Sequence, residues 1–192
     1  MWALIEENEI SKVLKGPKSL TIGDIQYPQN IFMIWSKEEL EAIGIYEIVS
    51  DDSNFKNPSY YTNTDQSFDW TGSEVVASYG EATPRELDDK TDDKGNVTHG
   101  LKWNHKEVIK RQAYGLLEPN DWYVVRQQEV GTEIPEAWST YRSEVRTTAE
   151  DMQSKINACT TVDELAALYK YNDAEPPVRP IGEWPQSPDN SV

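Results

Sequence analysis

A periodic run of large apolar residues after Pro135 is the feature that most constrains how this chain folds. The residues recur at intervals of about 3.6, the spacing of one face of an α-helix. Proline favours the first turn of a helix, because its missing N–H would have no intrahelical partner there. The sequence therefore predicts a long helix whose buried face carries Trp138, Tyr141, Val145, Met152 and Ile156.

A shorter helix is expected before this one, from Lys106 to Leu117. The residues Pro119-Asn120-Asp121 favour a turn, since proline fixes φ and the two polar side chains bond back to nearby backbone. Gly131 breaks the run that follows. These signals predict a helical hairpin packed around Trp122 and Trp138.

This part of the chain also resembles a known family. The motif consists of Arg111, Leu116-Leu117, Asp121-Trp122, Ile134-Pro135, Trp138, Tyr141-Arg142 and Val145-Arg146. It is similar to the small domain of bacteriophage tail assembly chaperones, which recurs in tail-fibre assembly proteins. The resemblance covers about residues 107–147, roughly a fifth of the chain. It implies a phage tail component or assembly factor that works by binding.

Tryptophan, tyrosine and arginine gather in the same stretch, and these residues are enriched at the centres of protein interfaces. The candidate partner-binding residues are Arg126, Arg142, Arg146, Trp122, Tyr141 and Trp184. A second interpretation stays open. Trp138 and Tyr141 fit the hairpin's own core, and the arginines fit ion pairs with nearby glutamates. We expect the arginines to face a partner, with Asp121 capping or pairing with one of them.

The charge of the chain excludes several classes of function. Net charge is −16, from 34 acidic and 18 basic residues, which argues against binding nucleic acid or anionic membranes. The single cysteine, Cys159, rules out an internal disulfide and is expected to be a small buried apolar group. Glu6, Glu7 and Glu9 interrupt the N-terminal apolar run, which argues against a signal peptide. We expect the protein in the host cytoplasm during assembly and in the virion tail.

No motif for catalysis is evident, so we expect neither enzymatic activity nor a cofactor. The two histidines and one cysteine are too few for a typical zinc site. No phosphate-binding loop or nucleophile-elbow pattern occurs. Oxygen ligands for calcium are present at Asp88, Asp89, Asp92, Asp93 and Asn96, but their register does not match a calcium loop. The sequence favours an exposed acidic loop over residues 87–99.

Residues 1–50 read as a small α+β unit. Met1 to Glu6 and Ile10 to Leu14 are expected to pair as strands around a turn at Glu7-Asn8. The apolar segment from Asn30 to Trp35 is expected to be buried. Ser36 and Glu39 form a capping box, which opens a brief helix that ends near Ile43 before Gly44.

Residues 51–100 contain short aromatic segments between turns. Tyr60–Thr62 and Phe68–Trp70 are candidates to pair with each other as strands, and Val75–Tyr79 is a further strand. Thr83-Pro84 is expected to begin a short helix. A second capping box, Thr161 with Glu164, predicts a helix near the C-terminus. Five prolines between residues 176 and 188 then favour an extended arm, anchored by Ile181 and Trp184.

The predicted fold class is α+β: a small β-rich N-terminal part, then a helical hairpin, then a proline-rich extended C-terminal arm. The expected domains are residues 1–100, 101–172 and 173–192. The leading hypothesis is a non-enzymatic bacteriophage tail protein that binds tail-fibre or baseplate components, as an adaptor or assembly factor, and that could form a homo-oligomer within the tail. Two alternatives stay open. One is a host-glycan-binding module that uses Tyr60, Tyr61, Phe68 and Trp70, and the other is an acidic mimic of DNA.

Overall fold

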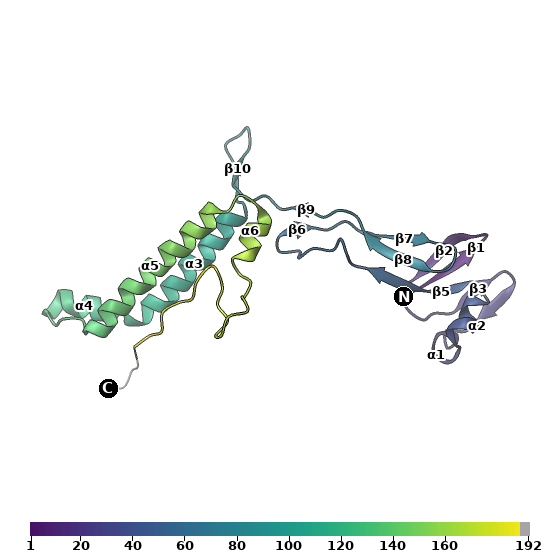
Figure 1. Ribbon diagram of the computed structural model, residues 1–192, viewed down its shortest axis with the longest axis horizontal. Coiled ribbons are helices and arrows are strands. Elements are labelled where there is room, and N and C mark those ends of the chain that lie inside the picture. The colour runs from purple at the N-terminus through teal and green to yellow at the C-terminus, as the bar shows by residue number, and fades with distance from the viewer. Residues whose placement is uncertain (189–192) are drawn as a thin grey trace. The chain divides into compact units, whose positions relative to one another are not determined.

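The computed structural model describes residues 1–188 and shows an α+β protein, with strands concentrated in the N-terminal region and long helices in the C-terminal half (Figure 1). The chain divides into two compact units, the first from Met1 to Thr83 and the second from Pro84 onwards. The residue predicted as the domain boundary, 100, lies inside the second unit, directly before its first long helix.

The first unit is built on a five-stranded sheet with the order β2-β1-β5-β8-β7. Its strands are β1 (Trp2–Glu6), β2 (Glu9–Leu14), β5 (Ile45–Asp51), β7 (Gln66–Trp70) and β8 (Val75–Tyr79). All neighbours are antiparallel except β5 and β8, which run parallel. The predicted hairpin of β1 and β2 is confirmed. Its turn residues Glu7 and Asn8 both have positive φ, as a tight two-residue turn requires.

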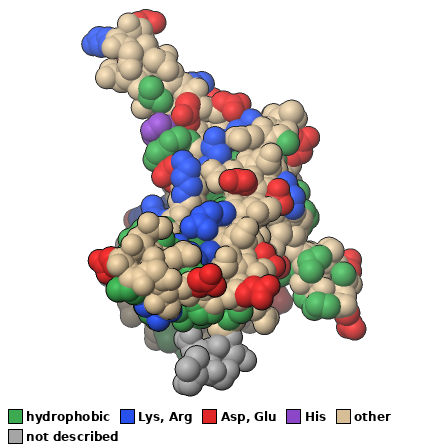
Figure 2. All heavy atoms as spheres, turned by 90° about the vertical axis from the view of Figure 1, so that its left-hand side faces the viewer, with side chains coloured by type: hydrophobic (Ala, Val, Ile, Leu, Met, Phe, Trp, Pro, Cys, Tyr) green, Lys and Arg blue, Asp and Glu red, His purple; other side chains and the backbone are tan. Residues whose placement is uncertain are grey.

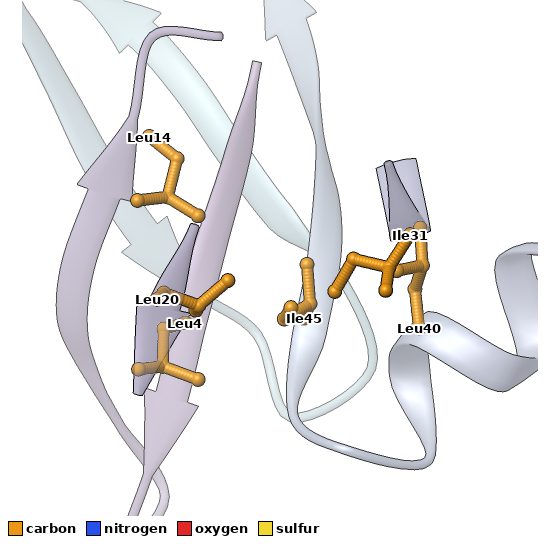
Figure 3. Close-up of a cluster of buried hydrophobic side chains, with 6 residues drawn as sticks. All are labelled: Leu4, Leu14, Leu20, Ile31, Leu40 and Ile45. Carbon is orange, nitrogen blue, oxygen red and sulfur yellow. The ribbon is translucent and has the colours of Figure 1, made fainter. Parts of the chain in front are cut away.

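One face of this sheet is covered by a short hairpin and two short helices. The hairpin pairs β3 (Leu20–Ile22) with β4 (Ile25–Tyr27), and the helices are α1 (Ile31–Ile34) and α2 (Lys37–Glu41). The predicted capping box at Ser36 and Glu39 opens α2. The side chains that meet between sheet and helices are buried (Figure 3): Leu4, Leu14, Leu20, Ile31, Leu40 and Ile45.

The two edge strands of the sheet, β2 and β7, contact each other on the opposite face. Strand register places Ala3, Val75 and Ala77 on this face, and all three are fully buried. The indole N–H of Trp70 on β7 donates to Asn8 Oδ1 in the β1–β2 turn at 3.0 Å, which joins the two edges of the sheet. Small side chains inside a tightly curved sheet leave room for the partly buried aromatic residues beside them.

Two small ladders complete the strand content. β6 (Tyr61–Thr62) pairs with β9 (Thr83–Pro84), and β10 (Lys90–Thr91) pairs with β11 (Val97–Thr98) in an exposed hairpin. The predicted helix start at Thr83-Pro84 is therefore wrong. The proposed pairing of residues 60–62 with 68–70 is also wrong, because β7 pairs with β8 and β6 pairs with β9. β6 and β9 are far apart in sequence, so local patterns could not reveal that pair, whereas β7 and β8 are consecutive strands joined by residues 71–74.

The second unit is a helical hairpin of α3 (Leu101–Leu117) and α5 (Glu136–Ala158), which lie side by side (Figure 1). A 3₁₀ turn (Glu118–Asn120) and α4 (Asp121–Val130) connect them. The predicted long helix is confirmed, with Pro135 at its N-cap. Four of the five stripe residues, Tyr141, Val145, Met152 and Ile156, are buried on it. The shorter predicted helix begins five residues earlier than expected, at Leu101.

The start of α3 requires a close backbone approach. A Cβ at Gly100 would lie 2.5 Å from the carbonyl carbon and oxygen of Asp88, so only glycine fits. The Gly100 N–H donates to Asp89 Oδ1 at 2.8 Å. This bond, with the bond between Asp89 and His99, lowers the pKa of the Asp89 carboxyl below its usual value. The acidic side chain thereby acts as a cap for α3 from outside the helix.

The C-terminal segment packs on the helical hairpin. The predicted capping box of Thr161 and Glu164 opens α6 (Val162–Ala167). Ile181 is buried, and its backbone N–H donates to the carbonyl of Leu168 at 2.9 Å. Trp184 Nε1 donates to Gln112 Oε1 on α3 at 3.2 Å. Both expected anchor residues therefore contact this unit itself, and Cys159 is buried as predicted.

Candidate protein-binding surface on helix α4

Helix α4 is unusual because none of its residues is buried, although it follows α3 with only a 3₁₀ turn between them. It ends at Gly131, whose φ of 72° is the left-handed conformation that closes a helix. A ten-residue helix is marginal in water by itself, so contacts along one side must hold it in place.

Those contacts come from a row of aromatic rings. Trp122 stacks on Tyr123 with ring centroids 3.9 Å apart. Tyr123 lies 5.7 Å from Trp138, and Trp138 meets Tyr141 edge-on at 5.8 Å. Aromatic pairs at such distances contribute about 0.5–1.5 kcal/mol each beyond the area they bury. The row therefore fixes α4 against the first turns of α5.

Arg142 holds the same junction by hydrogen bonds. Its guanidinium donates to the Leu117 carbonyl at 3.0 Å, to Asn120 Oδ1, and to Asp121 Oδ1 at 2.7 Å. The predicted pairing of Asp121 with an arginine is thus confirmed. The expectation that Arg142 faces outward is wrong: its exposed fraction is 6%, because α3, the turn and α4 all direct acceptors at it.

The placement of Trp122 also differs from the expectation. It was predicted to be a core residue of the hairpin, yet 51% of its surface is exposed, as is 52% of Val125 one helical turn further on. The sequence predicts a turn at Pro119-Asn120-Asp121 and assigns no helix to the residues that follow it. As a helix, the segment turns Trp122 and Val125 to the same outer side, where about half of each side chain stays exposed.

Arg126 adds a cation to this side of α4. Its guanidinium carbon lies 4.8 Å from the Trp122 ring centroid and 5.4 Å from that of Tyr123. Its Nε is buried but makes no hydrogen bond within the described chain. A guanidinium held over two rings is pre-organised to receive a carboxylate. We call Trp122, Val125 and Arg126 the α4 surface.

Of the six candidate residues, the structure brings only Trp122 and Arg126 together on this surface. Tyr141 is buried, and burial raises the pKa of its hydroxyl. Arg146 donates to the Arg142 carbonyl at 3.2 Å, and Trp184 contacts α3. Val125 was missed. Val125 lies three residues after Trp122, and residues at that spacing lie on the same side of a helix. The spacing could therefore have identified Val125 only if residues 121–130 had been assigned as a helix.

Helix α3 carries more basic than acidic side chains. Figure 2 shows Lys and Arg side chains among acidic ones on the side of the molecule that carries α4. Helix α3 contributes Lys102, Lys106, Lys110 and Arg111 against a single acidic residue, Glu107. Two of these lysines are already paired, Lys102 with Asp88 at 3.0 Å and Lys110 with Glu107 at 2.6 Å, so the charge of α3 does not indicate the charge of a partner.

Other candidate sites do not assemble. Tyr61, one of the four aromatic residues considered for glycan stacking, has an exposed fraction of only 7%, so these four do not form an open platform. Among residues 1–188, His, Cys, Asp and Glu side chains form no group of three placed to hold a metal ion. None of the described helices is both long enough and apolar enough to cross a bilayer.

Comparison with known proteins gave no relative. No protein-family model, no curated protein and no solved structure shows significant similarity to this chain.

Proposed function

We propose that this chain is a non-enzymatic bacteriophage tail protein that binds a tail-fibre or baseplate component through the α4 surface, as a structural adaptor or assembly factor. The sequence resemblance over residues 107–147 supports the phage context. The observation that carries the binding role is the exposed side of α4, a helix with no fully buried residue, which presents Trp122 and Val125.

The size of the exposed apolar area supports a partner contact. A tryptophan side chain can bury about 150–250 Å², so covering the outer half of Trp122 removes on the order of 100 Å² from water, about 2.5 kcal/mol at 25 cal/mol per Å². Val125 adds to this area. Trp and Arg are also the residues that most often dominate binding energy at interfaces. The α4 surface therefore has the composition of an interface centre.

The C-terminal segment belongs to the same proposal. Residues 173–188 form no helix or strand, and they include most of the prolines in this part of the chain. Residues 189–192 of the expected arm lie outside the described residues. After Trp184 the segment runs along α5, where Gln186 and Pro188 line a shallow hollow with Glu136 and Thr140, and we propose that it adds contacts to a neighbouring tail protein from there.

The phage context is tested on purified virions by quantitative mass spectrometry. A fixed copy number that matches the tail symmetry identifies a structural adaptor. Absence from virions combined with co-purification with the fibre protein from lysates identifies an assembly factor. Absence from both contradicts the tail assignment.

The binding surface is tested by two matched substitutions, Val125→Glu and Val97→Glu. The two valines have nearly equal exposed fractions, 52% and 51%, but Val97 lies on β11. We expect Val125→Glu to weaken capture of the identified tail partner at least tenfold, since it places a carboxylate in the apolar centre of the contact. Val97→Glu leaves capture unchanged. Equal effects, or no effect of Val125→Glu, would mean that α4 is not the interface.

A further inference from the structure

A pocket on the helix-covered side of the first unit is not part of the proposed tail contact. It has a volume of about 180 Å³ and is lined by Trp2, Phe32, Trp35, Lys37, Leu40, Ile45 and Glu47. We call it the Trp2 pocket. Leu40 and Ile45 are its buried lining residues, and its three aromatic side chains come from β1 (Trp2), α1 (Phe32) and the C-cap of α1 (Trp35).

Strand register explains why a carboxylate stands in this pocket. On β1 and β5, Leu4 is opposite Ile45 and Trp2 is opposite Glu47, so all four side chains lie on the face that packs against the helices. Glu47 continues an otherwise apolar row. A carboxylate at such a position must remain accessible to water or a ligand, because full burial without a partner is costly. Glu47 makes no ion pair or hydrogen bond within the described chain, so its oxygens are available as acceptors.

The aromatic walls are fixed by packing. Trp2 contacts Phe32 at a centroid distance of 4.8 Å, and Tyr27 supports Trp35 edge-on at 5.8 Å. Trp35 has an extended backbone directly before the Ser36 capping box, which redirects the chain and places Lys37 at the rim. The rings are therefore held in position before any ligand arrives, which lowers the entropic cost of binding.

Two charged side chains line the pocket together with the aromatic rings. Lys37 is a donor, and its Nζ lies 3.6 Å from Glu41 Oε1 in a pair that a ligand can easily replace. Glu47 is an acceptor in the lining of the same pocket. With Glu41 beside Lys37, these three side chains carry a formal net charge of −1, which disfavours an anionic ligand. The aromatic rings, one donor and one acceptor therefore determine which ligand the pocket accommodates.

We infer that the Trp2 pocket binds one neutral pyranose ring of a glycan. The volume is below the roughly 300–1,000 Å³ typical of pockets for drug-sized ligands, so it accommodates a single ring. A pyranose presents C–H groups on its ring face, which pack on indole, and hydroxyls on its edge, which accept from Lys37 and donate to Glu47. An apolar side chain would leave both charged groups unused, and an acidic sugar would meet Glu47.

The experiment uses the full chain and follows the indole N–H signals of its seven tryptophans by NMR during titration. The probes are the methyl α-glycosides of glucose, galactose and mannose, with glucuronic acid and cyclohexanol as comparison ligands. We expect at least one neutral glycoside to shift the Trp2 and Trp35 signals in a saturable manner, with a Kd on the order of 1 mM for so small a ligand, while the Trp103 signal stays in place.

Two matched variants test the polar contact. Glu47→Ala removes the acceptor at the pocket, and Glu9→Ala removes an exposed glutamate from β2 of the same sheet. We expect Glu47→Ala to weaken the glycoside about tenfold, as the loss of a hydrogen bond to a charged group does, and Glu9→Ala to change nothing. A Trp35→Ala variant should lose the saturable shift while the indole signals of the second unit remain unchanged.

Several results would overturn the inference. The pocket is not a sugar site if no glycoside gives a saturable shift at about fifty times the expected Kd. It is only an apolar cavity if cyclohexanol binds as well as the glycosides, or if Glu47→Ala has no effect. The assignment to neutral sugars is wrong if glucuronic acid alone binds. None of these outcomes bears on the α4 surface, which lies in the other unit.

Discussion

Arg142 is the residue on which the helical unit most depends. It donates to the last residue of α3, to the 3₁₀ turn and to the first residue of α4. Its side chain is 7% exposed, whereas that of its ion-pair partner Asp121 is 53% exposed. The ion pair itself is therefore screened by solvent and contributes little. Most of the stabilisation comes from the hydrogen bonds to the Leu117 carbonyl and to Asn120, which would otherwise be unsatisfied.

Replacing Arg142 by methionine keeps the apolar stem and removes the donors. We expect the free energy of unfolding of the second unit to fall by about 2–3 kcal/mol, because buried acceptors lose their partners. Urea unfolding of residues 84–192, followed by circular dichroism, measures this change. Arg146→Met is the matched control one turn later on α5. Its side chain makes a single described bond, to the Arg142 carbonyl, so we expect a loss below about 0.5 kcal/mol. Similar losses for both variants would contradict the central role of Arg142.

At the scale of the element, α3 carries two glycines with opposite requirements. Gly100, at its N-cap, has the Asp88 backbone 2.5 Å from where a Cβ would be, while Gly115, near its end, has nothing within 4 Å. We expect Gly100→Ala to destabilise the unit by about 1–3 kcal/mol, because backbone must shift. Gly115→Ala should stabilise it by about 0.5–1 kcal/mol through helix propensity. Thermal unfolding of the two variants shows shifts of opposite sign if the described start of α3 is correct, and equal shifts if it is not.

Elements with local signals could be predicted from the sequence. The capping boxes at Ser36 and Thr161 and the buried stripe of α5 each depend on residues within a few positions of one another, so the pattern and the structure agree. The segment from Ile31 to Ile34 is different. It is apolar throughout, yet Met33 and Ile34 are 75% and 69% exposed, because a single helical turn can bury only one side. The hydrophobic character of the segment could not show which side of this helical turn would be buried.

The candidate site was predictable only in part, for a related reason. Trp122 and Arg126 were selected by composition, and they do meet on α4. Arg142 was selected in the same way, but three acceptors from distant positions draw it inward. The Trp2 pocket combines residues 2, 32–37 and 45–47, which only the pairing of β1 with β5 brings together. Contacts between residues that are distant in sequence produce no periodic pattern of hydrophobic residues, so sequence periodicity cannot predict them.

At the scale of the whole molecule, the two compact units predict independent folding. Each has its own buried residues: the Leu4 and Ile45 cluster in the first, and the Val145 and Ile156 stripe in the second. Domains of this size can bury enough surface to fold alone. We therefore expect separate fragments, residues 1–83 and 84–192, to unfold cooperatively, the first with a β-rich and the second with a helical circular dichroism spectrum.

The Arg142→Met substitution tests whether the two units unfold independently. The contacts of Arg142 all lie in the second unit. The substitution should therefore lower the melting temperature of fragment 84–192 and of one transition in the full chain, and leave the transition of residues 1–83 unchanged. If calorimetry shows two transitions and the substitution shifts only one of them, the chain contains two cooperative units. A single free energy of unfolding is then not defined for the whole chain. A single transition that shifts as a whole, or a fragment 1–83 that melts without cooperativity, would show that the units depend on each other. In that case a weakened helical unit would also impair the Trp2 pocket, and ligand binding there would report on both.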